Sequence, residues 1–466
     1  YILMIKRLFQ FVPTRILATA LIGLTGLPMG CPQATATNRQ TNAATPASQS
    51  SAVVAETAMP TAATWRSPSR LHRISLNALY PSGSSNIRPI AQAISPNSEV
   101  LAILSTQSDR SQSDGAPPER SALALWNLES GTRRITLMPA NRGEPGAQVI
   151  AFTPNNERIV AGLTDGDIRV WDATTGKSLR RWNAHESEIT AIAISSNRQF
   201  LVTGSRDRVV KVWELSSGNL LQTLSLGEAE SSPVRGLQIS ANSSRLAVAT
   251  ERSIQLWDSL NAQRVKVAVQ FSPQQAQHLT SGIQLAMTFS PDSTQLATLD
   301  TDNSIKLWNA SSGARIITLR ISLDQPEQPI QALAFHPNGQ RLLSRDVNQS
   351  MLDWNLQPYG PGNYAVDLDA ILQPHSTDVV SIDGNRIDSA NAIATPNPIT
   401  FSADGQMVAI PLKGLSYPTS GYGTDLRDVP SGERSFIIPE ARQIHFSPNN
   451  LFLVATETSQ VQIWQP

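Results

Sequence analysis

A histidine, a hydroxyl and a carboxylate lie close together near the middle of the chain, as His185, Thr203 and Asp207. These are the side-chain types of a hydrolytic triad, in which a carboxylate orients a histidine and the histidine activates a hydroxyl. The chain contains no Gly-x-Ser-x-Gly elbow, the turn that exposes a nucleophile in many hydrolases. The residue types alone leave a catalytic and a structural role open for the three.

Potential metal ligands are sparse and scattered. Zinc sites need clustered cysteines and histidines, whereas this chain has one cysteine and six histidines, the other five being His72, His278, His336, His375 and His445. The acidic pairs at residues 300 and 302 and at residues 367 and 369 lack the spacing of a calcium-binding loop. We therefore expect no metal site and no cofactor.

The first thirty-one residues have the layout of an export signal. Lys6, Arg7 and Arg15 precede an uncharged, mostly apolar stretch over residues 16–30. A membrane-spanning helix needs about 20 apolar residues, so this stretch is too short to serve as one. We expect residues 1–31 to form a signal peptide.

The only cysteine, Cys31, directly follows Gly30 at the end of this stretch. The pair resembles the lipobox of bacterial lipoproteins, in which a small residue precedes a cysteine that is acylated, and this implies that Cys31 is a lipid anchor. The lipobox is degenerate, because Pro28 stands where that family has leucine and Met29 where it has a small residue. Small residues at 34–36 leave ordinary secretion open, and an uncleaved or cytosolic chain is a third alternative.

Residues 32–64 are rich in alanine, threonine and serine and contain no aromatic residue. Such a segment lacks the large apolar side chains that would offset the entropy lost when a backbone is ordered. We expect it to be a flexible tether between the anchor and the domain that follows.

One short phrase occurs eight times in the remainder, residues 65–466. It combines an apolar residue with Ser, Thr or His and ends in Asn or Asp, at Ile94, Phe152, Ile194, Ile239, Phe289, Phe335, Phe401 and Phe446. Alternating apolar residues precede each copy, and the Pro, Asn, Asp and Ser residues that follow favour tight turns. Each copy therefore predicts a strand that ends in a turn.

A tryptophan ends a later strand in seven of these eight units. In units two to six and eight it lies 18 or 19 residues after the phrase, and in unit one a polar insertion over residues 105–119 lengthens this distance. Unit seven carries Arg427 at this place. A turn with glycine and a fourth strand then complete most units, so each unit predicts a sheet of four antiparallel strands.

Such sheets bury both faces only when they stack around an axis, which predicts a β-propeller. The turn phrase and the closing Trp-Asp resemble the WD-repeat family over residues 65–466. We expect an all-β propeller of eight four-stranded blades, with seven blades as the alternative if residues 357–396 disrupt one. The last unit lacks a fourth strand, and the segment Arg70–Leu76 is expected to supply it and close the ring.

The resemblance assigns roles to several side chains. In the WD-repeat family a His, a Ser or Thr, an Asp and the Trp form a hydrogen-bonded chain inside a blade, which implies this structural role for His185, Thr203, Asp207 and Trp213. The residue before the turn aspartate often contacts partners in this family. It is Arg206 here, and with Arg208 and Arg345 it is expected to form a basic, partner-binding rim. Insertions at residues 105–119, 373–396 and 411–423 are further binding candidates.

The charge balance limits the class of partner. The chain carries 37 Lys and Arg against 37 Asp and Glu, which gives no electrostatic basis for binding nucleic acid. We expect a non-enzymatic scaffold for protein partners, exported and held by its lipid in a bacterial cell envelope. Two alternatives remain: a propeller enzyme of lactonase, peptidase or quinone-dependent type with its site at the central channel, and a cytosolic signalling scaffold.

Overall fold

The structure discussed here is a computed structural model, and the parts of it that can be described lie in the repetitive region. They are residues 65, 68–80, 86–107, 120–141, 144–227, 232–259, 264–270, 287–300, 304–319, 330–346, 351–356, 367–372, 399–413, 422–441, 443–457 and 459–466. The predicted signal peptide (1–31), its Cys31 and the predicted tether (32–64) lie outside these residues.

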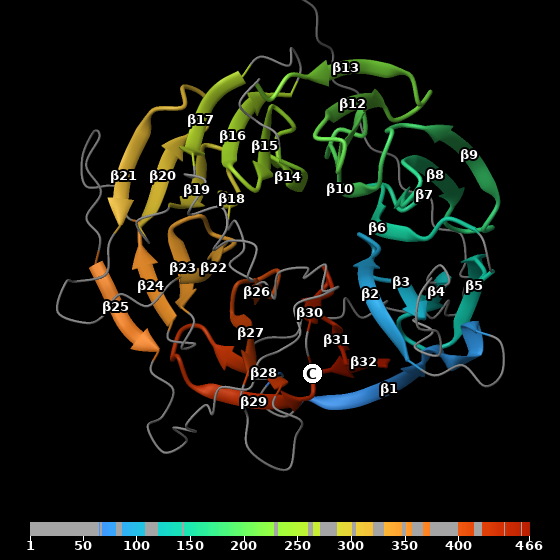
Figure 1. Ribbon diagram of the computed structural model, residues 1–466. Coiled ribbons are helices and arrows are strands. Elements are labelled where there is room, and N and C mark those ends of the chain that lie inside the picture. Colours follow the sequence, from blue (N-terminus) through green and yellow to red (C-terminus); the bar gives the residue numbers. More distant parts are fainter. Residues whose placement is uncertain are drawn as a thin grey trace, which may run out of the picture. The chain divides into compact units, whose positions relative to one another are not determined.

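Eight four-stranded antiparallel sheets form the blades of a ring (Figure 1). In blades 1 to 7 the four strands pair in chain order, whereas blade 8 has the order β1-β32-β31-β30. The N-terminal strand thus completes the last blade, and its pairing runs from Ser69 opposite Gln465 to Ser75 opposite Gln460. The all-β, eight-bladed prediction is confirmed, and the seven-bladed alternative is wrong.

The strand bounds follow the repeat units. Blades 1 to 4 consist of β2 (Ile87–Ile94), β3 (Val100–Gln107), β4 (Arg120–Asn127), β5 (Arg133–Met138); β6 (Ala147–Phe152), β7 (Arg158–Leu163), β8 (Asp167–Asp172), β9 (Ser178–Asn183); β10 (Ile189–Ile194), β11 (Phe200–Ser205), β12 (Val210–Glu214), β13 (Leu220–Leu224); and β14 (Val234–Ile239), β15 (Arg245–Thr250), β16 (Ser253–Asp258), β17 (Arg264–Gln270).

Blades 5 to 8 consist of β18 (Met287–Phe289), β19 (Gln295–Leu299), β20 (Ile305–Asn309), β21 (Arg315–Leu319); β22 (Ile330–Phe335), β23 (Arg341–Asp346), β24 (Met351–Asn355), β25 (Asp367–Leu372); β26 (Thr400–Phe401), β27 (Met407–Lys413), β28 (Tyr422–Asp428), β29 (Arg434–Pro439); and β30 (Gln443–Phe446), β31 (Leu453–Thr456), β32 (Gln460–Gln465), β1 (Ser69–Ser75). A short 3-10 helix, η2 (Leu76–Leu79), follows β1.

The recurrent phrase forms a turn that its own side chains hold closed. In blade 3 the Ser195 hydroxyl donates to Asn197 Oδ1 at 2.6 Å and accepts from the backbone N–H of Phe200 at 2.9 Å. Arg198 between them has a φ of 62°, a left-handed conformation that tight turns require. The serine and asparagine therefore serve the turn, which explains why Ser, Thr or His and then Asn or Asp follow each first strand.

The same turns also join neighbouring blades. The Asn97 N–H of blade 1 donates to Asn156 Oδ1 of blade 2 at 2.8 Å. The Asn449 N–H of blade 8 donates to the Ser98 hydroxyl of blade 1 at 3.1 Å. The ring is thus closed by the type of hydrogen bond that also links blades within the chain.

Apolar side chains fill the space between neighbouring blades, and a tryptophan from the later blade joins most of these cores. Trp171 packs between blades 1 and 2, Trp213 between blades 2 and 3, and Trp354 between blades 5 and 6. Each blade therefore shares its core with its neighbours, as in other repeat architectures.

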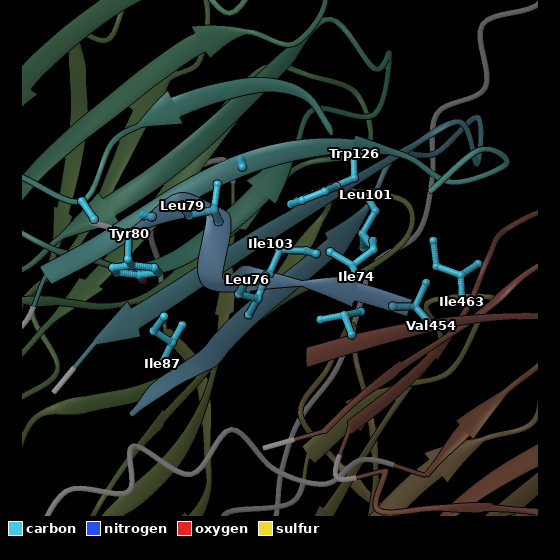
Figure 2. Close-up of a cluster of buried hydrophobic side chains, with 14 of the residues drawn as sticks. Ile74, Leu76, Leu79, Tyr80, Ile87, Leu101, Ile103, Trp126, Val454 and Ile463 are labelled. Atoms are coloured by element: carbon cyan, nitrogen blue, oxygen red, sulfur yellow. The ribbon is translucent and has the colours of Figure 1, made fainter. Parts of the chain in front are cut away.

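The core between blades 8 and 1 contains residues from both ends of the domain (Figure 2). Ile74 of β1 and Leu76 of η2 pack with Val454 and Ile463 of blade 8 and with Ile103 of blade 1. All five are at most 2% exposed. Burial of such side chains contributes about 1.5–3 kcal/mol each, so the N-terminal strand is held by packing as well as by pairing.

Trp65 extends this closure to the next junction. Its side chain is 1% exposed in the core between blades 7 and 8, and its ring meets Phe446 edge-on with centroids 5.6 Å apart. Trp65 is therefore part of the propeller core.

Two predicted insertions begin later than expected because the strands before them are longer. Ser105 pairs with Ala122 and Gln107 with Arg120, so β3 continues to Gln107. Pro411 pairs with Thr424, and β27 continues to Lys413. The remaining inserted residues, 108–119 and 414–421, and the third predicted insertion at 373–396 lie outside the described part of the chain.

The antiparallel order places all three insertion points on one face of the ring. Second and fourth strands of a blade run in the same direction, so β3, β25 and β27 end on the face where β11 ends. We name this the insertion face. The turn that holds Asp207 follows β11 and lies on the same face.

Candidate functional site

The four predicted chain residues of blade 3 come together in one hydrogen-bonded series. The Trp213 Nε1–H donates to Thr203 Oγ1 at 2.9 Å, and Thr203 Oγ1 lies 2.7 Å from His185 Nε2. The His185 Nδ1 lies 2.8 Å from Asp207 Oδ2. When Nδ1–H donates to the carboxylate, Nε2 accepts the threonine proton, and this tautomer satisfies every group in the series.

Different elements bring these residues together. Thr203 and Trp213 lie on the paired strands β11 and β12, where Leu201 is the cross-strand partner of Trp213. His185 lies between β9 and β10, and its backbone N–H donates to the Gly166 carbonyl of blade 2. Any side chain at Gly166 would place Cβ 2.1 Å from the His185 carbonyl oxygen, so glycine is required for this approach.

Asp207 is held as a carboxylate. Burial alone raises the pKa of Asp207, but the hydrogen bond and attraction to His185 and the N–H groups of Val209 and Glu186 outweigh it, so the pKa is lowered overall. The Val209 N–H donates to Asp207 Oδ1 at 2.9 Å and the Glu186 N–H to Oδ2 at 3.2 Å. Asp207 thereby ties the turn after β11 to the connection that precedes β10.

The arrangement has triad-like members but offers no access to a substrate. The side chains of His185 and Thr203 are buried, and the acceptor site of the threonine hydroxyl is taken by Trp213. A nucleophile must meet a reacting atom at about 3 Å. Within blade 3 these groups therefore act as an internal polar network.

Two further blades carry part of the network, which was not predicted from the sequence. The Trp308 Nε1–H donates to Thr298 Oγ1 and the Trp354 Nε1–H to Ser344 Oγ, both at 2.9 Å. Each hydroxyl lies two residues after the cross-strand partner of its tryptophan, as Thr203 does. A hydroxyl residue at this position of the second strand is the sequence feature that could have predicted these two hydrogen bonds.

The other blades place an apolar side chain at the hydroxyl position. Val248 occupies it in blade 4, and the Nε1 of Trp257 is buried with no hydrogen-bond partner in the described part of the chain. Ala455 occupies it in blade 8, where Trp464 Nε1 is also buried with no hydrogen-bond partner among the described residues. Among the described residues, histidine, hydroxyl, carboxylate and tryptophan are joined in full in blade 3.

The predicted basic rim is divided between two places. Arg206 and Arg208 flank Asp207 on the insertion face, and both are exposed. The Arg206 Nε lies 3.0 Å from Glu188 Oε2, so part of its charge is compensated. Arg345 is different, because it lies in β23 of blade 6 and is 7% exposed, so it does not share a surface with Arg206 and Arg208.

Blade 7 holds a buried ion cluster at the place of the missing tryptophan. Arg427 is paired with Val408, as tryptophans are paired in other blades, and its Nε donates to Asp425 Oδ2 at 2.8 Å. The Arg434 Nε donates to the other oxygen, Oδ1, at 3.0 Å. The Asp425 side chain is 2% exposed and that of Arg427 8%. The sequence showed that arginine replaces tryptophan here, but it did not reveal the ion pair of Arg427 with Asp425.

No group of three or more His, Cys, Asp or Glu side chains in the described part is placed to hold a metal ion. None of the helices described there has the length and apolar character needed to cross a membrane. Cys31 lies outside the described residues, so its predicted acylation stays a prediction.

Comparison with known proteins supports the repeat family. Residues 147–172, 176–214 and 269–309 match the family described as WD domain, G-beta repeat (WD40). These segments end at Asp172, Glu214 and Asn309, each directly after a closing tryptophan. These three segments are therefore similar to WD40 repeats, and the second of them ends in β12 of blade 3, directly after Trp213.

One solved structure, a designed protein, has a similar fold, and a second gives a weaker match. The computationally designed Ika8 protein is 18% identical over 85% of this chain and 99% of its own, with a TM-score of 0.54. The β-propeller domain of Cps50 (Swd1) from Myceliophteria thermophila is 18% identical over 69% of this chain and 97% of its own, with a TM-score of 0.49. No curated protein matches the sequence. At such identity the similarity concerns the fold alone.

Proposed function

We propose that the chain is a non-enzymatic scaffold for protein partners, exported and anchored by a lipid on Cys31 in a bacterial cell envelope. WD40 propellers commonly serve as protein-interaction scaffolds, and three segments of this chain are similar to WD40 repeats. The proposal assigns no cofactor and no nucleic acid to it, consistent with the balanced charge of the whole chain.

The proposal of a non-enzymatic function rests on one observation, that the side chains of the His185 network are hydrogen-bonded to one another. Its hydroxyl, imidazole and carboxylate are the strongest catalytic candidates by residue type, yet each is bonded to another member of the series. Catalysis by these groups would require the blade to release them, at the cost of buried polar groups left without partners. A structural function uses the network as it stands.

A rigid ring with binding residues on loops fits a scaffold. Arg206 and Arg208 lie on the insertion face in a turn that Asp207 fixes by hydrogen bonds to two backbone amides. Because Arg206 already has an anionic partner in Glu188, a carboxylate of a binding protein would displace Glu188 from the Arg206 guanidinium. The insertion face is therefore the first surface to test for partners.

The envelope location rests on the sequence before the propeller. Basic residues, an apolar stretch, Cys31 and a tether follow one another in the order that anchoring of a surface-held domain requires. The intact mass of the mature protein from purified membranes tests it. Acylation at Cys31, lost in Cys31→Ser, is the expected result. Cleavage after residue 36, or an intact N-terminus in the cytosol, would overturn the anchor.

Partner binding is tested with affinity capture by wild type, Arg206→Glu and Arg198→Glu. Arg198 is a matched control, because it lies in a turn of the same blade on the opposite face. Loss of a specific partner with Arg206→Glu alone would support the insertion face. Unchanged partners with both variants would remove this face from the proposal, and no specific partner for wild type would contradict the scaffold function itself.

A further inference from the structure

The outer strand of each blade presents an unpaired edge at the perimeter of the ring (Figure 1). A free edge offers a row of backbone N–H and C=O groups to any other strand, and proteins protect such edges with charged side chains. Among the outer strands β1, β5, β9, β13, β17, β21, β25 and β29, only β13 carries no charged residue. Its sequence is Leu-Leu-Gln-Thr-Leu.

The missing charge falls at one structural position. The outer-strand residue paired with the tryptophan is arginine in blades 1, 4, 5 and 8, namely Arg133, Arg264, Arg315 and Arg70. Blade 7 has Arg434 opposite Arg427. In blade 3 this residue is Leu220, opposite Trp213, and blades 2 and 6 have Ser178 and Leu368 there, on strands that carry charged residues elsewhere. An apolar side chain thus stands where most blades place a cation.

The side chains at this edge are open to solvent. Leu220 is 49% exposed and Leu221 47%, and Leu179 of the adjacent outer strand β9 is 44% exposed. These are three of the four large hydrophobic side chains found exposed in the described part of the chain. Two neighbouring outer strands therefore hold three of these four side chains, a grouping that favours an interaction site over scattered exposure.

A cation flanks the uncharged edge. The Arg180 side chain lies against Gly218, two residues before Leu220, such that a Cβ on this glycine would be 3.1 Å from Arg180 Cδ and Nη1. Gly218 has a φ of 73°, so its turn both requires glycine and leaves room for the arginine. Arg180 is exposed and has no ion-pair partner among the described residues. Its charge complements a carboxylate on a ligand.

We propose that β13 is a docking edge, at which an extended segment of a partner protein adds a fifth strand to blade 3. The segment pairs its backbone with β13, places apolar side chains against Leu220 and Leu221, and carries an acidic residue that reaches Arg180. This inference rests on the proposed protein-binding function and names a second surface for it. Strand addition of this type derives affinity from main-chain hydrogen bonds and specificity from alternate side chains.

The length of the edge favours a peptide over a second copy of the chain. Five residues of strand span about 17 Å at roughly 3.4 Å per residue, which is one short segment. A stable dimer interface buries about 1,600 Å² in total, more than a single pair of such strands provides. A short peptide strand suits a transient interaction of this size, and Arg180 has no acidic counterpart on β13 itself.

The probe for the test is a synthetic fluorescein-labelled peptide of alternating valine and threonine that carries two glutamates at one end. A matched peptide replaces the glutamates by lysines. Fluorescence anisotropy measures binding to the folded propeller, and hydrogen exchange with mass spectrometry locates it. We expect saturable binding of the glutamate peptide, weaker binding of the lysine peptide, and slower exchange confined to residues 220–224.

Substitutions separate the edge from other surfaces. Leu220→Arg installs the residue that blades 1, 4, 5 and 8 already accept at this position, so the fold is expected to be retained and binding to weaken at least about tenfold, a loss of roughly 1.4 kcal/mol. Arg180→Glu is expected to weaken the glutamate peptide and not the lysine peptide. Lys266 of blade 4 lies beside Gly313 of blade 5 as Arg180 of blade 2 lies beside Gly218 of blade 3, so Arg315→Leu is expected to create a second binding edge.

Several results would overturn the proposal. They are the absence of saturable binding, equal binding by Leu220→Arg, protection outside β13, and a concentration-dependent dimer of the propeller that Leu220→Arg abolishes, which would assign the edge to a second copy. A natural partner that binds Leu220→Arg as well as wild type would reject this edge while leaving the scaffold function intact.

Discussion

Blades 3 and 7 fill the same structural slot with opposite chemistry. In blade 3 the slot holds Trp213, whose indole N–H begins the series that ends at Asp207. In blade 7 it holds Arg427, which is bound to Asp425 beneath the surface. A propeller tolerates both because each blade contacts only its two neighbours, so a change in one slot is confined to one junction.

The junctions that these blades form with the blade before them differ accordingly. Between blades 2 and 3, the rings of Trp182 and Trp213 meet at 5.9 Å and 61° within an apolar core. Between blades 6 and 7 the buried core consists of Ala332, Leu343, Met351, Ile399, Val408 and Ile410, and the partly buried Phe401 packs against it with its ring 5.1 Å from that of His336. The blade 6–7 junction thus lacks the tryptophan that the blade 2–3 junction buries, and Arg427 stands at the place of that tryptophan in blade 7.

The largest expected effect is the loss of one ion partner in blade 7. Asp425→Ala leaves Arg427 buried without its carboxylate, which costs about 3–5 kcal/mol for pairs of this kind. Urea unfolding measures the change. The double variant Asp425→Leu with Arg427→Met is the control, since it removes both charges and is expected to recover most of the loss. An equal loss in both variants would show that packing, and not charge, is what the single substitution removes.

A smaller loss is expected in blade 3 when the central hydroxyl is removed. Thr203→Val keeps the shape but leaves Trp213 Nε1 and His185 Nε2 without a partner, at a cost of about 1–3 kcal/mol. Thr203→Ser retains the hydroxyl and serves as the control. Ile410 holds the equivalent position in blade 7, and Ile410→Val should cost only about 0.5–1.5 kcal/mol as a lost methylene. A Thr203→Val variant as stable as Thr203→Ser would contradict the network.

Acid should weaken blade 3 through Asp207. Because the folded-state pKa of Asp207 lies below its ordinary value of 3.8, its contribution to stability is complete above that value. The contribution is lost as pH falls through the lower folded-state pKa. Asp207→Asn should flatten this part of the stability profile, measured by urea unfolding between pH 2 and 6. An unchanged slope in the variant would assign the acid sensitivity to other groups.

The smallest predicted effect is a gain in blade 4. Val248→Thr supplies a hydroxyl two residues after the cross-strand partner of Trp257, the geometry that serves Trp213, Trp308 and Trp354. A new buried hydrogen bond is worth about 0.5–1.5 kcal/mol, here reduced by the loss of one methyl group. Thermal unfolding compares it with Val248→Ala, which is expected to be less stable than wild type. A destabilised threonine variant would show that the slot in blade 4 has relaxed around valine.

Much of the fold could be predicted because the same strand and turn pattern occurs eight times, so an ambiguous assignment in one unit is settled by the others. Eight copies of one turn fixed the blade count, and the missing fourth strand of the last unit identified β1 as its replacement. Strand ends were less predictable: Ser105 and Pro411 have loop-like side chains, yet their backbones continue the pairing of β3 and β27.

The candidate sites were less accessible to sequence reasoning. The His185 series could be assigned because four residue types recur at family spacing. Burial of a long cationic side chain depends on the neighbouring blade, so the sequence placed Arg345 at a rim although it is covered. The pairing of Asp425 with Arg427 and the bare edge at Leu220 emerge only when all eight blades are aligned in space.

The central claim is that the propeller is a binding scaffold whose blade 3 edge receives a partner strand. It is tested most directly by photocrosslinking in cells, with p-benzoylphenylalanine in place of Leu221 of blade 3 or of Ser435, the matching residue of blade 7. The account predicts a discrete protein adduct at position 221 that excess glutamate peptide suppresses, and none at position 435. Equal adducts at both positions, or none at 221, would contradict it.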